Sequence, residues 1–283
     1  MPIDAREVRE RLLDLFPAAT IQQFPQVREK MTKVEGIAAV AQHAALTDVR
    51  EFAATMFGYL HQHVHVFHRI PAHDHLNVPT PFGVDPFTST TAGQEHHYFY
   101  LVPLIYELVL DAPLERHSVT FAWPVKVVVA PDHVRIHFTI MAKKPQAYAA
   151  DGRVVVNSTQ EPTERDLLGE FHLDVGHPLD LNRGIKALWD ADVFDAPVVR
   201  YKRSRATSLE VMDEAFTVKR DDPQRYAELA GKPLYNTTFT FTGENACIKY
   251  FVSDPTQGRL AFRRYSFSTD CVDDVVRQIL AAN

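Results

Sequence analysis

Residues 119–140 read VTFAWPVKVVVAPDHVRIHFTI, and this stretch indicates the fold more strongly than any other. Apolar side chains occupy alternate positions along most of both halves, the period that is typical of β-strands. Between the halves lies Ala130-Pro131-Asp132-His133, with proline at the second position, where a β-turn favours it. The stretch therefore predicts an antiparallel hairpin.

Downstream of this hairpin, shorter alternating runs predict strands at 153–157, 235–241, 247–252 and 259–267. Apolar residues with helical spacing, preceded by capping residues, predict helices at 180–189, 207–216, 222–230 and 270–281. Upstream, the same spacing predicts helices at 4–16, 26–45 and 48–69. Residues 94–110 fit either a helix interrupted near Pro103 or a helix followed by a strand.

These patterns predict an α+β fold, with a mostly helical N-terminal part followed by antiparallel β-hairpins or a meander with flanking helices. The expected division is a helical region at 1–112 and an α+β region with an antiparallel sheet at 113–283. The two regions are also compatible with a single integrated domain.

Composition excludes several classes of protein. The chain has 283 residues, of which 46% are hydrophobic and 23% charged, so it is not collagen-like, disordered or a coiled coil. Its formal charge of -6 argues against unspecific wrapping of nucleic acid, although not against a local basic patch.

Location is predicted from the cysteines and from the apolar runs. Cys247 and Cys271 are far apart and are expected to be separate core residues, which favours a reducing compartment, the cytoplasm. The N-terminus lacks the apolar core of a signal peptide. The most apolar run, residues 98–110, is too short to span a bilayer, so no membrane association is expected.

Histidines are dense between residues 61 and 75. On the helix predicted at 48–69, His61, His65 and His68 are spaced i, i+4 and i+7 along one flank. His73 and His75 follow in a predicted loop and could complete a site for a divalent transition metal such as zinc. The alternative is a structural role, because hydrogen-bonding residues commonly lie beside an apolar helix face.

Basic residues cluster ahead of Thr207, the expected N-cap of a helix: Arg200, Lys202, Arg203 and Arg205. A helix N-terminus favours an anion, and arginine matches phosphate oxygens. Arg263 and Arg264 are expected to extend this anion-binding site. The alternative is a solvated charged segment without a ligand.

Three classes of function remain open. The first is a binding or regulatory protein that contacts an anionic partner, nucleic acid or a nucleotide phosphate, through the basic segment. The second is a metal-dependent hydrolase that uses the histidines. The third is an interaction subunit that binds another protein without chemistry. The chain contains no Gly-rich phosphate loop, no His-Glu-x-x-His and no Gly-x-Ser-x-Gly, so no motif identifies an enzyme.

Overall fold

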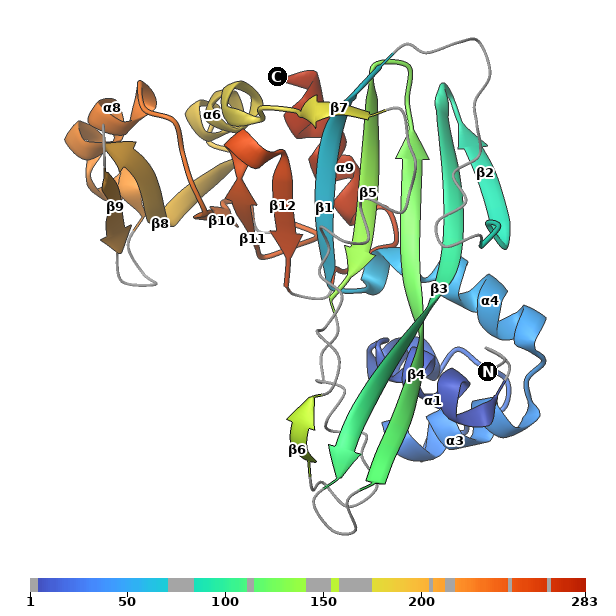
Figure 1. Ribbon diagram of the computed structural model, residues 1–283. Helices are drawn as coiled ribbons and strands as arrows, with labels where there is room; N and C mark the ends of the chain where they lie inside the picture. The colour runs from blue at the N-terminus through green and yellow to red at the C-terminus, as the bar shows by residue number, and fades with distance from the viewer. Residues whose placement is uncertain are drawn as a thin grey trace. The chain divides into compact units, whose positions relative to one another are not determined.

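Figure 1 shows a computed structural model of the chain, which describes residues 5–70, 84–110, 115–140, 154–157, 175–203, 206–211, 217–243, 246–263 and 266–283. The chain forms two compact units. Unit 1 comprises residues 1–57, 72–127 and 138–174, and unit 2 comprises residues 58–71, 128–137 and 175–283.

The predicted hairpin is confirmed. Strands β4 (Glu115–Val129) and β5 (His133–Thr139) are neighbours in the sheet, and the predicted turn joins them. Both strands run through both units, because β4 ends in unit 2 and β5 ends in unit 1. Almost every described side chain of the pair is buried, including the polar side chains between the alternating apolar positions, such as Lys126, Arg135 and His137.

Unit 1 combines helices with a small group of strands. Its helices are α1 (Arg6–Asp14), α2 (Ala18–Ile21), α3 (Lys33–His43) and α4 (Leu46–Thr55). Its other strands are β2 (Thr88–Ala92), β3 (Glu95–Leu110) and β6 (Val154–Asn157). β2 and β6 both pair antiparallel with β3, which neighbours β4. Helix α3 begins at a capping box formed by Thr32 and Glu35, and α4 packs through the ring of Phe52 against Phe16 and Phe24.

Unit 2 is built on an antiparallel sheet in the order β5-β1-β12-β11-β10-β8-β9, with β7 also paired to β1. Its strands are β1 (Gln62–Arg69), β7 (Val175–Pro178), β8 (Phe194–Arg203), β9 (Ala206–Val211), β10 (Thr237–Phe241), β11 (Tyr250–Asp254) and β12 (Arg259–Phe262). Its helices are α6 (Asn182–Asp190), α7 (Val218–Asp221), α8 (Pro223–Ala230) and α9 (Cys271–Ala281), with the short 3₁₀ turns η1 (Phe57–Tyr59) at the junction of the units and η4 (Pro255–Gln257).

One face of this sheet forms the core of unit 2. Val64, Phe239, Phe251 and Leu260 are fully buried there, together with side chains from α6 and α9 such as Trp189. Sheet and helices are therefore joined by a single apolar cluster, the main stabilising feature of the unit.

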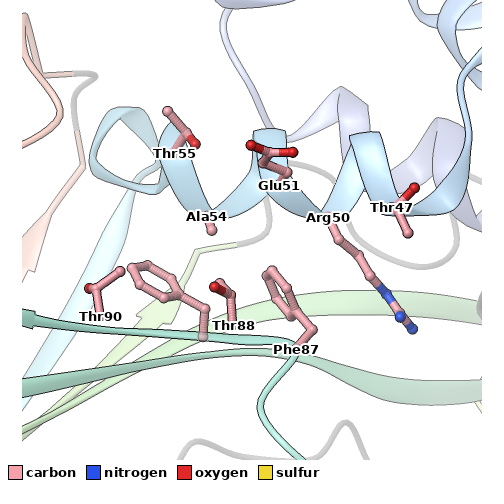
Figure 2. A pocket seen from close by; sticks show the side chains of 9 residues that line it. Thr47, Arg50, Glu51, Ala54, Thr55, Phe87, Thr88 and Thr90 are labelled. Atoms are coloured by element: carbon pink, nitrogen blue, oxygen red, sulfur yellow. The ribbon is translucent and has the colours of Figure 1, made fainter.

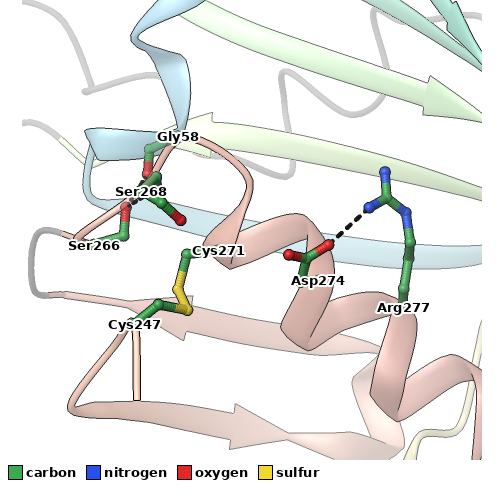
Figure 3. The surroundings of a disulfide bond; sticks show 7 residues. All are labelled: Gly58, Cys247, Ser266, Ser268, Cys271, Asp274 and Arg277. Carbon is green, nitrogen blue, oxygen red and sulfur yellow. Dashed lines mark hydrogen bonds and ion pairs between the residues drawn. A yellow bond between two sulfur atoms is a disulfide. The ribbon is translucent and has the colours of Figure 1, made fainter. Parts of the chain in front are cut away.

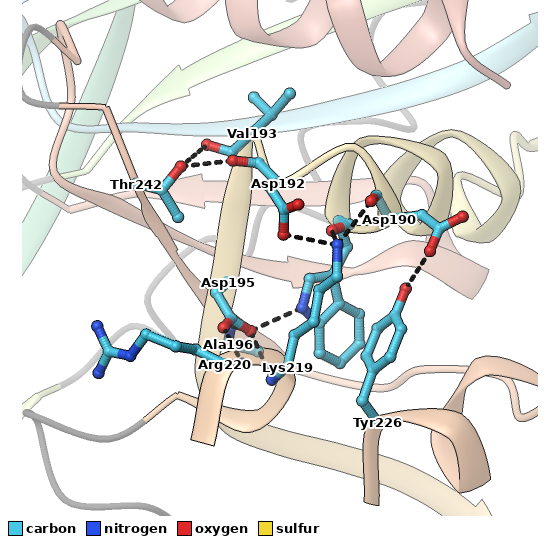
Figure 4. Close-up of polar contacts among 10 residues, drawn as sticks. Asp190, Asp192, Val193, Asp195, Ala196, Lys219, Arg220, Tyr226 and Thr242 are labelled. Atoms are coloured by element: carbon cyan, nitrogen blue, oxygen red, sulfur yellow. Dashed lines mark hydrogen bonds and ion pairs between the residues drawn. The ribbon is translucent and has the colours of Figure 1, made fainter. Parts of the chain in front are cut away.

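A buried carboxylate connects β8 to α7 (Figure 4). Asp195 Oδ1 accepts hydrogen bonds from Trp189 Nε1 at 2.7 Å and from the backbone N–H groups of Ala196 and Lys219, and Oδ2 accepts from the backbone N–H of Arg220. Burial by itself would raise the pKa of Asp195, but the Thr217 side chain and these donors together lower that pKa below its ordinary value. Asp195 is thus held as an anion inside the unit.

The prediction of separate, reduced cysteines is wrong. Cys247 and Cys271 form a disulfide with their Cα atoms 5.8 Å apart, beside Ser266, whose hydroxyl donates to the carbonyl of Gly58 (Figure 3). The prediction of a cytoplasmic location rested on free cysteines. Because disulfides persist in oxidising compartments, the cysteines no longer support that prediction. In the described ranges, no helix combines the length and apolarity needed to cross a bilayer.

The predicted fold class is also wrong, because the region 1–112 is not mostly helical. Helix α4 ends at Thr55 and β1 begins at Gln62. Strand β3 occupies 95–110, where the sequence predicted a helix interrupted near Pro103 or a helix followed by a strand. The physical reason is visible in β1, where buried Val64 and Val66 alternate with less buried neighbours, the period of a strand. In β3, the β-branched and aromatic residues favour an extended backbone.

Candidate functional site

Strand pairing places five positions in one row across the sheet of unit 2. Val198 of β8 pairs with Thr238, which pairs with Val252, which pairs with Ala261, which pairs with His63 of β1. Residues directly opposite each other in neighbouring strands share a face of the sheet. The row therefore marks the face opposite the apolar core, since its neighbours Val199, Phe239, Phe251, Leu260 and Val64 are buried in that core.

This face is partly accessible to solvent. Val198, Thr238, Val252 and His63 are half-buried, whereas the alternating positions on the other face are fully buried. We call it the basic face and define it by His63, His65 and Arg259, which share the row's orientation, together with His61 and Arg263, which directly flank β1 and β12.

Arginine and histidine contact each other in the middle of the basic face. Arg259 lies directly opposite His65, and its NH2 group donates to His63 Nδ1 at 3.1 Å. Because an arginine can only donate, Nδ1 acts as the acceptor and the ring proton of a neutral His63 lies on Nε2. Asp254 is opposite Arg259 on β11 and offsets part of its charge. Arg263 is exposed just beyond β12.

Two aromatic residues accompany these charges. The rings of His65 and Phe67 are stacked, with centroids 6.4 Å apart and an interplanar angle of 9°. Tyr250 occupies the same face of β11 as Val252, two residues away, and is half-buried. Flat rings next to cations can hold the base and the phosphate of a nucleotide at the same time.

The basic segment predicted from the sequence is part of a β-hairpin. Arg200, Lys202 and Arg203 belong to β8, in register with Leu209, Thr207 and Ala206 of β9. Strand alternation assigns positions 200 and 202 to the face that carries Val198, and position 203 to the opposite face. The register of the hairpin thus brings two of the predicted anion-binding positions to the basic face. Arg205 and Arg264 lie outside the described residues.

The predicted helix N-terminus at Thr207 is wrong. Thr207 lies inside β9, so no helix dipole is present there to favour an anion. The β-branched Thr207 and Val211 favour a strand, and the capping-box spacing of Thr207 and Glu210 occurred by coincidence. Anion binding by the six predicted residues therefore stays a prediction. It depends on the charges of their side chains and not on a helix N-terminus.

The predicted helical flank of histidines is also wrong. On β1, His65 and His68 are three positions apart and therefore lie on opposite faces, with His68 exposed. His73 and His75 lie outside the described residues. Within the described ranges no three His, Cys, Asp or Glu side chains come together as a metal site, so zinc binding by the five histidines stays a prediction.

Sequence reasoning missed the contact between Arg259 and His63, which are 196 residues apart. One signal was present, because the histidines at 61, 63 and 65 alternate with Gln62 and Val64, as on a half-buried strand. No sequence pattern indicated that β1 pairs with β12. The chain matches no protein-family model, and no curated protein or solved structure resembles it.

Proposed function

We propose that unit 2 binds single-stranded nucleic acid along its basic face. One observation carries the proposal: the register of the sheet gathers His63 and His65 of β1 and Arg259 of β12 on one partly exposed face, with Arg263 exposed just beyond β12. Positions 200 and 202 of β8 share that face.

The chemistry of the basic face supports a single strand as the partner. Cationic side chains neutralise phosphates, and the rings of Phe67 and Tyr250 offer stacking surfaces for unpaired bases. A strand-rich, gently twisted face also gives an extended chain several contacts in succession. The net charge of -6 limits unspecific attraction, so that binding would depend on this local face.

The decisive experiment compares two neighbouring positions of the same hairpin. Lys202→Ala changes a position that the register assigns to the basic face, whereas Arg203→Ala changes a position that it assigns to the opposite face. We expect Lys202→Ala to weaken the binding of a fluorescent single-stranded oligonucleotide and to reduce the slope of log K against log salt by about 0.7. Arg203→Ala should change both quantities much less. Fluorescence anisotropy at a series of salt concentrations provides both measurements.

Arg263→Ala tests the other end of the face, and Arg277→Ala is its control. Arg277 is a partly exposed cation paired with Asp274 on α9, which packs against the core face of the sheet. The proposal fails if the wild-type protein does not bind the oligonucleotide at low salt. It also fails if Lys202→Ala and Arg203→Ala weaken binding equally.

A further inference from the structure

A cleft lies in unit 1, between helix α4 and the hairpin of β2 and β3 (Figure 2). The cleft has a volume of about 500 Å³, within the range of roughly 300–1,000 Å³ that is typical of small-molecule sites. It is lined by Thr47, Arg50, Glu51, Ala54, Thr55, Phe87, Thr88, Thr90 and Phe99.

One side of the cleft is a single face of α4. Its lining residues occupy positions 47, 50, 51, 54 and 55, which follow the i, i+3, i+4 spacing of one helix stripe. Val49 and Ala53 on the other side of the helix are fully buried and fix α4 to its unit. The helix therefore presents Arg50 and two threonine hydroxyls to the cleft as a rigid set.

The other side is formed by β2, the residue before it, and β3. Thr88 pairs with Phe99 and Thr90 lies two positions further along β2, so strand alternation places these three residues on one face. Phe87 directly precedes β2, and its backbone N–H donates to the carbonyl of Phe99 at 3.0 Å. This hydrogen bond fixes Phe87 beside β3, where it also lines the cleft.

Arg50 is the chemically distinctive residue of the cleft. Its Nε atom is buried, and no acceptor in the described part of the chain bonds to it. Figure 2 shows the guanidinium extending from α4 toward the strands, to one side of Phe87, while the carboxylate of Glu51 points away from the strands. Burying a guanidinium N–H without an acceptor costs free energy, which an anionic ligand would recover.

We propose that this cleft binds a small organic anion with a flat apolar body, an aromatic phosphate monoester or carboxylate. Arg50 would pair with the anionic group, and the rings of Phe87 and Phe99 would pack against the apolar body. The threonine hydroxyls at positions 47, 55, 88 and 90 supply further hydrogen bonds along the cleft. The site lies wholly in unit 1 and does not depend on the basic face of unit 2.

Calorimetric titration with phenyl phosphate, inorganic phosphate and benzyl alcohol tests whether binding needs both an anionic group for Arg50 and an apolar body for the two phenylalanine rings. Phenyl phosphate should bind at least about tenfold more tightly than either of the others, because only it satisfies Arg50 and fills the aromatic part of the cleft. Benzoate in a parallel titration distinguishes a carboxylate ligand from a phosphate ligand.

Arg50→Gln should weaken phenyl phosphate binding at least about tenfold, and Arg50→Lys should retain part of the affinity because the charge remains. Arg28→Gln is the matched control, because it removes an exposed arginine of the same unit that does not line the cleft, and it should not weaken binding. Equal affinity of Arg50→Gln and wild type for phenyl phosphate would overturn the proposal. Equal binding of phenyl phosphate and benzyl alcohol by the wild-type protein would overturn it independently of any variant.

Discussion

At the scale of single residues, Asp195 dominates the polar interior of unit 2. We expect Asp195→Asn to lower the free energy of unfolding by roughly 3 kcal/mol at pH 7, because a neutral amide weakens several charge-assisted hydrogen bonds at once. The pKa of Asp195 is lower in the folded protein than its ordinary value of 3.8. The ionised Asp195 side chain therefore stabilises the folded state to its full extent at pH values above 3.8. The contribution is lost as the pH falls through the folded pKa. The difference in the free energy of unfolding between wild type and variant, measured by urea unfolding, should therefore decrease below about pH 4.

Asp192→Asn is the control for this measurement. The Asp192 side chain is 76% exposed and pairs with Lys219, so the variant should lose less than about 1 kcal/mol. A gap between wild type and Asp195→Asn that stays constant from pH 7 to pH 2 would contradict the assigned ionisation.

At the scale of elements, the packing of α6 against α9 depends on Gly184. A Cβ atom at this position would lie 2.0 Å from the carbonyl oxygen of Ile279, so an alanine would force the two helices apart. We expect Gly184→Ala to lower the free energy of unfolding by about 2–3 kcal/mol, measured by thermal unfolding. Gly231→Ala, at the end of α8, is the matched control because an added Cβ would meet no atom within 4 Å. Similar losses in both variants would contradict the assignment of the loss to the contact with Ile279.

At the scale of the whole molecule, the disulfide fixes the start of α9 to the segment that precedes β11. The two cysteines are separated by 24 positions, and closing a loop of that length stabilises a protein by about 3 kcal/mol in the chain-entropy estimate. The double variant Cys247→Ala, Cys271→Ala should therefore unfold at a lower urea concentration than the oxidised wild type. A reducing agent should lower the midpoint of the wild type and leave that of the variant unchanged. An unchanged wild-type midpoint after verified reduction would contradict this prediction.

The sequence by itself determined the elements whose signals are local. The hairpin of β4 and β5, the helices α6, α8 and α9, and the approximate positions of β10, β11 and β12 follow from periodicity and capping within about twenty residues. The cap of α8, where the Asp222 side chain accepts from the backbone N–H of Arg225, is an example in which one residue pair suffices.

Tertiary structure alone decided the features that join distant segments. The histidine stretch at 61–68 satisfies both a helical and an alternating spacing, and pairing of β1 with β12 selected the strand. The same long-range pairing brought Arg259 to His63 and so created the basic face, while the approach of α4 to the hairpin of β2 and β3 left Arg50 facing a cleft. Such contacts carry no signal within a short window, because which strands become neighbours depends on burying the apolar surface of the whole unit.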